Sequence, residues 1–330
     1  MKWVRKLLKK NRIKGIEPFN ELYFKDCFFT LLFSIIIHYK KNIDPIIANE
    51  SIFYENNDDK SIIRVGYEPI KDYKNVLLNI GIHVTNKITK NDFVPNIITS
   101  ISENKPVIVL VDCYFEPMIM DAYKKKHLLH SALIYGYDNQ TRSFDIIEFE
   151  YSDSTNYKKN IISYKDMYLA HNSEIVNEYH KKSDNVAFEF SLDNNTHLFS
   201  NSCDILIDNL KSNKIRMLES MNCFDCFLNH FENNIERIQV YPKKCLDLFI
   251  KIYNSKKIEY YRIHRILNKY ESLALKQYEI MKKWSKIVTQ FGIYYYNNNL
   301  NENNTKKIRE SLELAYLMEI DFIDHIFKVI

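Results

Sequence analysis

The spacing of hydrophobic positions changes near residue 200 of the chain. Before that point, short apolar runs alternate with polar turns, and the run at residues 107–111 is fully apolar and rich in β-branched side chains. Such runs predict buried strands. After residue 203, apolar residues recur at steps of three and four, which predicts helices alone. We therefore expect an α/β domain at residues 1–195 and an all-α domain at residues 196–330.

One helix and one hairpin are the clearest elements of the α/β domain. Residues 27–39 are almost continuously apolar and follow Asp26, a good N-cap, so they predict a buried helix. Residues 131–137 and 143–149 predict an antiparallel strand pair, because only a short polar turn separates them. The other predicted elements are helices at 44–48, 72–79, 93–103 and 164–170, strands at 82–84, 107–111 and 186–192, and, in the second domain, helices at 204–211, 215–233, 242–254, 258–291 and 305–330.

Charge and apolar content limit the function classes. The net charge is +4, and residues 1–16 carry seven Lys or Arg and no acid. This segment is either a docking arm for an acidic partner or nucleic acid, or a solvated amphipathic helix; the second is the commoner meaning of a charge run. The sequence shows no secretion signal, and its most apolar run, residues 28–37, is too short to span a bilayer. We expect a cytoplasmic protein without a membrane partner, whose six cysteines are reduced.

A cysteine and a histidine are placed for nucleophilic catalysis. Cys27 stands at the start of the predicted helix, where the helix dipole favours a thiolate, and His130 stands at the start of a predicted strand. A histidine that pairs with the thiol lowers its pKa, and an acid should orient the far nitrogen of the ring. With a turn centred near residues 139–140, alternation returns Glu148 to the face of His130 and points Asp145 away. A bulge would reverse this choice, so both acids remain candidates.

Several stretches together resemble a known family. They are residues 26–30 (Asp-Cys-Phe-Phe-Thr), residues 109–114 (Val-Leu-Val-Asp-Cys-Tyr), and residues 127–130 (His-Leu-Leu-His) with residues 134–138 (Ile-Tyr-Gly-Tyr-Asp). In this order they resemble the N-terminal domain of the butirosin-biosynthesis aminoglycoside acyltransferase family, which is similar in fold to papain-like and C39-type cysteine peptidases. The resemblance covers roughly residues 15–192. It implies a papain-like domain with an antiparallel sheet, with Cys27 as nucleophile and His130 as general base.

The resemblance also implies a reaction. Such enzymes move an acyl group from a carrier-protein thioester, through a cysteine thioester, to an amine, which forms an amide in secondary-metabolite pathways, including nonribosomal peptide assembly. The expected partners are an acyl or peptidyl carrier protein, whose phosphopantetheine arm presents the substrate, and a small-molecule amine. No bound cofactor is expected. The alternatives are a C39-like cysteine peptidase and a non-catalytic binding protein on the same fold.

The chain departs from the family pattern in ways that affect the rest of the site. C39 peptidases carry a glutamine six residues before the cysteine to bind the oxyanion, and this chain has Glu21 there with Asn20 beside it. Because a carboxylate cannot donate a hydrogen bond unless it is protonated, the expected oxyanion hole is the Cys27 backbone N–H together with Asn20, or another group. Asp112 and Tyr114 are candidates for lining the cleft and binding the amine; a turn cap and a packing residue are equally good interpretations.

Other chemistries have weaker sequence support. Cys223, Cys226 and His230 form a C-x-x-C-x-x-x-H run, but their helical spacing is equally that of a buried stripe, so no metal site is expected. The three tyrosines at 294–296 are better suited to closing a helical core than to stacking nucleic-acid bases. No P-loop, dinucleotide-binding or zinc-protease motif is present.

Overall fold

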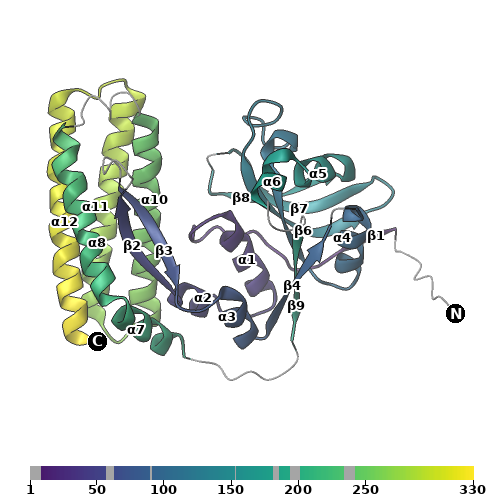
Figure 1. Ribbon diagram of the computed structural model, residues 1–330, viewed down its shortest axis with the longest axis horizontal. Helices are drawn as coiled ribbons and strands as arrows, with labels where there is room; N and C mark the ends of the chain where they lie inside the picture. Colours follow the sequence, from purple (N-terminus) through teal and green to yellow (C-terminus); the bar gives the residue numbers. More distant parts are fainter. Residues whose placement is uncertain are drawn as a thin grey trace. The chain divides into compact units, whose positions relative to one another are not determined.

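The computed structural model describes residues 9–56, 63–89, 91–152, 154–180, 186–193, 201–233 and 242–330. The chain divides into two compact units (Figure 1). Unit 1 comprises residues 1–43 and 74–199, and unit 2 comprises residues 44–73 and 200–330. Residues 44–73, expected in the first domain, belong to unit 2, so unit 2 is assembled from two separate stretches of sequence.

Unit 1 is built on a seven-stranded antiparallel sheet. Its strand order is β4-β9-β5-β6-β7-β8, and β1 pairs with the far end of β6. The mixed α/β class and the antiparallel sheet are thus confirmed, with the apolar run at 107–111 in a central strand. The strands are β1 (Lys10–Arg12), β4 (Ile82–Ile88), β5 (Val107–Asp112), β6 (Leu129–Asp138), β7 (Ser143–Phe149), β8 (Tyr157–Ser163) and β9 (Val186–Leu192).

Helix α1 (Cys27–His38) packs against β5 and β6, and it positions Cys27. The carboxylate of Asp26 accepts a hydrogen bond from Phe29 N, which satisfies one of the free amides of the first turn. The helix is buried from Phe29 to Ile36, as its apolar sequence predicts. The other helices assigned to this part are α3 (Tyr73–Asn79), α4 (Phe93–Ser102), η1 (Cys113–Phe115), α5 (Tyr164–His171) and α6 (Glu174–Tyr179).

The basic N-terminal segment is described only from residue 9 onward. Residues 1–8 lie outside the described residues, and Lys10–Arg12 form β1 instead of a helical turn. Lys10 pairs with Asp138 at 3.2 Å, and Arg12 pairs with Asp145. The charges of this stretch are therefore partly neutralised by the hairpin strand that β1 joins and by its neighbour β7.

Unit 2 contains a hairpin as well as helices, so the expectation of an all-α domain is wrong. Strands β2 (Glu50–Asn56) and β3 (Ile63–Pro69) pair with each other, and β2 is buried over its first five residues. Helix α8 packs on β2, and the apolar side chains of the hairpin are buried in the helical core. The hairpin therefore belongs to unit 2 and not to the first domain. The helices are α2 (Asp44–Ala48), α7 (Ser202–Ser212), α8 (Lys214–Asn233), α10 (Pro242–Tyr261), α11 (Glu271–Tyr296) and α12 (Glu302–Val329).

The predicted single helix at residues 258–291 is interrupted. Helix α10 continues to Tyr261, and a π-helical turn, η2 (Arg262–Ile266), follows it before α11 begins. The amide of Leu267 donates to the carbonyl of Arg262, five residues back, which is the π-type spacing. The apolar period alone did not show this break, because the residues on both sides of it remain buried.

The buried imidazole of His171, at the end of α5, gives unit 1 a pH-dependent stability. Its Nδ1 lies 2.8 Å from the carbonyl of Leu110 and its Nε2 lies 2.6 Å from the hydroxyl of Thr89. Burial lowers the pKa of His171 to about 4, so the folded chain holds a neutral ring. As pH falls below 6.5, the unfolded chain binds this proton first, so the contribution of His171 is complete above pH 6.5 and lost toward pH 4.

We expect this group to remove about 3 kcal/mol of stability between pH 7 and pH 4. The measurement is the free energy of unfolding in urea at both pH values for the wild type, His171→Gln and His83→Gln, whose ring is exposed. His171→Gln should lose less stability on acidification than the other two proteins. Equal pH dependence in all three would contradict the prediction.

Candidate active site

The thiol of Cys27 is half-buried at the first residue of α1. It donates a hydrogen bond, with Sγ 3.5 Å from the hydroxyl oxygen of Ser131, the residue after His130 on β6. Burial raises the pKa of Asp26, the neighbouring cap, which weakens the opposition of its carboxylate to a second negative charge.

His130 is buried and meets Glu148. Its Nε2 lies 2.8 Å from Oε1 of Glu148, at ion-pair distance but without hydrogen-bond alignment. The ring packs on Phe149, with centroids 3.8 Å apart, and lies almost parallel to Tyr157 at 6.2 Å. These aromatic contacts restrict the imidazole, so its orientation is set by the strands β7 and β8.

Glu148 lies on the face of His130, but the strand register that puts it there differs from the predicted one. The turn ends at the pair Asp138↔Ser143, and Gly136 lies opposite Asp145. If that register continued, Asp145 would share the face of His130. A bulge between Ile134 and Gly136 shifts the register by one residue, and the shifted pairing Leu133↔Ile147 brings Glu148 to that face instead.

Asp145 has a different partner. Its carboxylate accepts from Nε of Arg12 at 3.0 Å and also pairs with the terminal guanidinium nitrogen. A side chain at position 136 would collide with this carboxylate, so Gly136 is required for the arrangement. Asp145 therefore holds β1 against the hairpin and does not contact His130 in the described structure.

A second buried acid lies beside Glu148. Glu116 follows η1 and is fully buried, and both of its carboxyl oxygens, like Oε2 of Glu148, lack a hydrogen-bond partner. Burial raises the pKa of both glutamates, and the charge of Glu148 raises that of Glu116 further. Each of these adjacent carboxyls disfavours ionisation of the other, and Glu148 is the one that faces the imidazole.

Cys27 and His130 belong to one cluster but are not hydrogen-bonded to each other in the described part of the chain. Sγ of Cys27 lies 3.5 Å from the hydroxyl of Ser131, the neighbour of His130 on β6, and the ring centroids of His130 and Tyr157 lie 6.2 Å apart. Burial raises the pKa of Tyr157, and Cys27 and Glu148 raise it further. In unliganded sites, catalytic hydrogen bonds are often long and tighten when substrate binds.

Asn20 fixes the backbone of Tyr157. Its Oδ1 accepts from Tyr157 N at 2.8 Å, and its Nδ2 donates to Tyr157 O at 3.1 Å. The predicted oxyanion donor thus acts as a clamp on the first residue of β8 in this structure. Only its second amide hydrogen is left for another acceptor.

Asp112 and Tyr114 form a separate group around His127. Asp112 is buried; its Oδ1 accepts from the amides of Tyr114 and Leu128, and its Oδ2 lies 2.6 Å from Nδ1 of His127. Tyr114 stacks on the His127 ring at 4.3 Å. These contacts match the interpretation of Asp112 as a turn cap. His127, 54% exposed, is the member of this group open to solvent.

The C-x-x-C-x-x-x-H run lies on α8, where Nδ1 of His230 is 2.7 Å from the carbonyl of Cys226. Within the described ranges, no three His, Cys, Asp or Glu side chains are grouped as metal ligands. The helices described here also include none that combines the length and apolar character of a membrane span.

No protein-family model matches this chain, and no curated protein matches its sequence.

Three residues of the cluster were not identified from the sequence: Ser131, Tyr157 and Glu116. Ser131 carried a weak signal, because it is a polar residue inside an apolar strand directly after His130. Tyr157 and Glu116 carried none. A tyrosine before a polar strand and a glutamate after a short turn are common, and only the packing of β8 and η1 brings them to the site.

Proposed function

We propose that unit 1 is a papain-like cysteine acyltransferase that forms an amide. The observation that carries the proposal is the clustering of a helix-start cysteine, Cys27, with a buried histidine–glutamate pair, His130 and Glu148. A cysteine nucleophile, a base and an orienting acid are the parts of a thiol acyl-transfer site. The similarity in motif order to carrier-dependent aminoglycoside acyltransferases supports a thioester as donor.

The reaction proceeds in two steps. Sγ of Cys27, as a thiolate, attacks the thioester carbonyl, and the phosphopantetheine thiol leaves with a proton from the His130 imidazolium. The amine then attacks the acyl-cysteine, His130 takes the amine proton, and the carbon–sulfur bond breaks to release the amide. Glu148 stabilises the imidazolium in the state with a thiolate.

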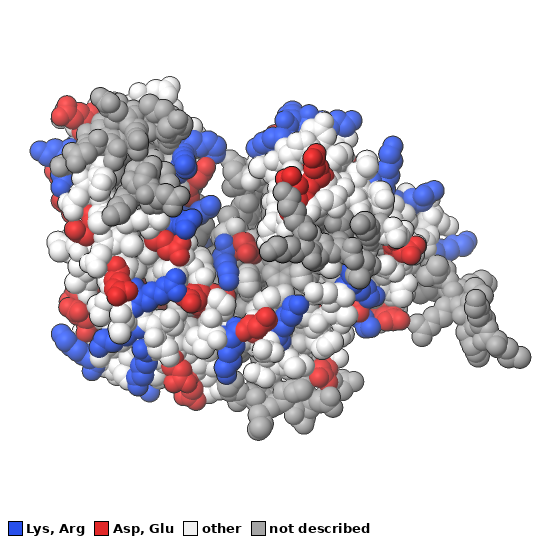
Figure 2. All heavy atoms as spheres, in the orientation of Figure 1, with Lys and Arg blue, Asp and Glu red and all other residues white. Residues whose placement is uncertain are grey.

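The carrier protein would approach beside His130. The connection that leads into β6 contains Lys124, Lys125 and Lys126, all exposed, with exposed Met120 and Leu129 next to them. An acidic carrier with an apolar contact helix suits such a surface. On the face drawn in Figure 2, basic and acidic side chains are otherwise interspersed, without one continuous basic patch.

The proposal predicts a covalent intermediate on Cys27. Wild type incubated with an acyl-loaded carrier protein, or with an acyl N-acetylcysteamine thioester, should gain the mass of one acyl group, and hydroxylamine should remove it. Cys27→Ala should gain none. Intact mass spectrometry makes the measurement.

The matched control is Cys245→Ala, which should keep the adduct. Burial raises the pKa of the Cys245 thiol to about 11, so this cysteine is a poor nucleophile near neutral pH. An adduct of equal yield in Cys27→Ala, or no adduct on the wild type with any donor, would reject the acyltransferase. Cleavage of a leader-like peptide without acyl transfer would favour the peptidase alternative.

A further inference from the structure

Several buried polar atoms around the candidate site lack a hydrogen-bond partner among the described residues: Oε1 and Oε2 of Glu116, Oε2 of Glu148 and Nε2 of His130. All three side chains are buried, and the two glutamates are fully so. Native proteins leave few buried polar groups without a partner, because each one has lost its hydrogen bonds to water. Such a concentration at one site requires partners within the cluster itself.

The backbone holds Glu116 next to Glu148. The amide of Glu116 donates to the carbonyl of Cys113 at 3.2 Å, which closes the turn η1, and its side chain lies beside Glu148 and the Cys113 thiol. Oε1 of Glu148 accepts from the amide of Phe149 at 2.8 Å and also lies 2.8 Å from Nε2 of His130. Oε2 is therefore the oxygen of Glu148 that is left for Glu116.

The charges in this cluster balance when one of the two carboxyls carries a proton. The His130 imidazolium matches one carboxylate, and it lies against Glu148. Burial raises the pKa of both glutamates, and the charge of Glu148 raises that of Glu116 further. The other titratable groups that face the pair, the Cys113 thiol and the Tyr157 hydroxyl, are kept neutral by burial, which raises the pKa of each.

A shared proton also supplies the missing hydrogen bond. Two carboxylates are both acceptors, so they cannot bond to each other, whereas a carboxylic acid donates to a carboxylate. One proton between Glu116 and Glu148 gives a partner to one oxygen of each residue and removes the repulsion between two buried charges.

We propose that Glu116 is a positioning residue of the candidate active site: its protonated carboxyl donates a hydrogen bond to Oε2 of Glu148 and keeps Glu148 ionised opposite His130. Glu116 acts through Glu148 and touches neither the thiol of Cys27 nor the substrate. Its part in the reaction rests on the function proposed above, whereas the hydrogen bond itself is measured without a substrate.

Infrared difference spectra of the full chain at neutral pH locate the proton. The wild type should show the carbonyl stretch of a buried carboxylic acid that Glu116→Gln lacks. Glu148→Gln should keep that band, because Glu148 is the carboxylate of the pair. Glu17→Gln, at a position 71% exposed, should leave this region of the spectrum unchanged. No band lost in Glu116→Gln, or a band lost in Glu148→Gln, would overturn the proposal.

Glu116→Leu and Glu116→Gln test the positioning role. A glutamine amide still donates to Glu148, whereas leucine leaves the carboxylate without that donor. The low-field Nε2–H proton resonance of His130, identified by its absence in His130→Ala, should move upfield in Glu116→Leu and stay near its wild-type position in Glu116→Gln. Acylation of Cys27 should slow roughly 10- to 100-fold in Glu116→Leu, the range for losing a hydrogen bond to a charged group, and less than about threefold in Glu116→Gln.

These measurements distinguish a failure of this proposal from a failure of the acyltransferase. If the wild type is not acylated but the infrared band and the His130 resonance respond as described, the reaction is rejected and the positioning of Glu148 by Glu116 stands. If Cys27 is acylated but the His130 resonance is unmoved in Glu116→Leu, or moves equally in Glu116→Gln, the positioning role is overturned. Should Glu116→Leu not fold, the infrared comparison of the two glutamine variants decides.

Discussion

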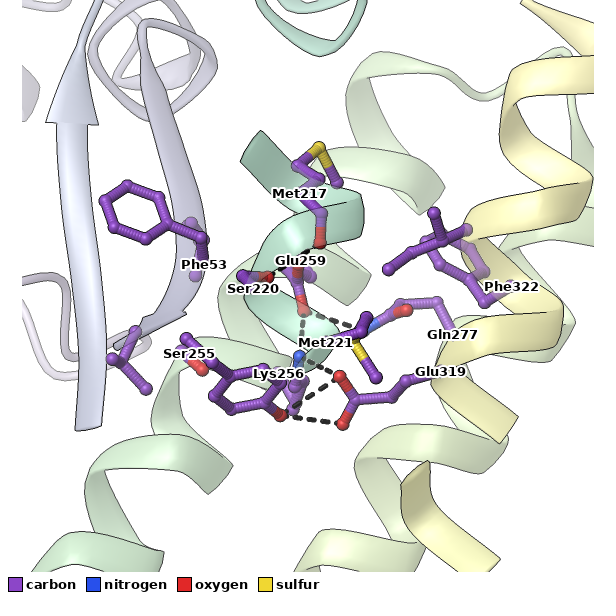
Figure 3. A pocket seen from close by; sticks show the side chains of 14 residues that line it. Phe53, Met217, Ser220, Met221, Ser255, Lys256, Glu259, Gln277, Glu319 and Phe322 are labelled. Atoms are coloured by element: carbon purple, nitrogen blue, oxygen red, sulfur yellow. Dashed lines mark hydrogen bonds and ion pairs between the residues drawn. The ribbon is translucent and has the colours of Figure 1, made fainter. Parts of the chain in front are cut away.

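Glu319→Ala is expected to lower the free energy of unfolding of unit 2 by about 3–5 kcal/mol, the range for breaking a buried ion pair. Glu319 accepts from three buried donors: the Lys256 ammonium at 2.7 Å, the Tyr54 hydroxyl at 2.8 Å and the Trp284 ring nitrogen at 2.7 Å (Figure 3 labels Lys256 and Glu319). Removing the carboxylate leaves Tyr54 and Trp284 without an acceptor. It also leaves Lys256 with Glu259 alone.

Urea unfolding followed by the fluorescence of Trp284 measures this effect within unit 2. Trp284 is fully buried against Phe224 and Phe249, so its emission reports on this core. Glu310→Ala, an exposed position on the same helix, is the control and should change stability by less than about 0.5 kcal/mol. A loss below about 1 kcal/mol in Glu319→Ala would mean that the buried network does not stabilise the unit.

His130→Ala is expected to slow acylation of Cys27 by about 10²- to 10⁴-fold, the usual contribution of a general base. Without the imidazole, the thiol keeps its hydroxyl partner Ser131 and ionises only with the help of the helix amides. Single-turnover acylation followed by rapid quench and mass spectrometry gives the rate. His83→Ala, an exposed histidine of unit 1, should leave the rate within about twofold of the wild type.

The same assay distinguishes the two acids of the hairpin, Glu148 and Asp145. Glu148→Gln should slow acylation, since it removes the charge that stabilises the imidazolium, whereas the Asp145 carboxylate is paired with Arg12 on the other side of the bulge. An equal loss of rate in Asp145→Asn and Glu148→Gln would contradict this assignment. An unchanged rate in His130→Ala would remove the base from the mechanism.

The local hydrophobic pattern predicted an element correctly wherever one whole face of that element is buried. Helix α1 begins at Cys27 because Asp26 caps it, and both features can be read from adjacent residues. The strands β5, β6 and β7 follow from short β-branched or alternating runs. Glu148 lies near His130 for a reason other than the predicted one, because the turn ends later than assumed and a bulge compensates for the difference.

The hydrophobic pattern did not predict the features that depend on packing between segments far apart in the sequence. No strand was predicted over residues 50–69, where the hairpin β2–β3 packs against α8 in unit 2. The break at η2 interrupts a helical period that continues on both sides of it. Asn20 has the right chemistry for an oxyanion donor, but the backbone of Tyr157, far along the chain, takes its amide.

The amino-acid order alone determined the class of elements and put a thiol at the start of a buried helix, since these depend on neighbours a few residues apart. Tertiary structure alone decided which acid meets His130, and it alone brought Ser131, Tyr157 and Glu116 to the site. Those outcomes depend on strand register, burial and charges contributed by distant segments, and a one-residue shift in pairing is enough to exchange them.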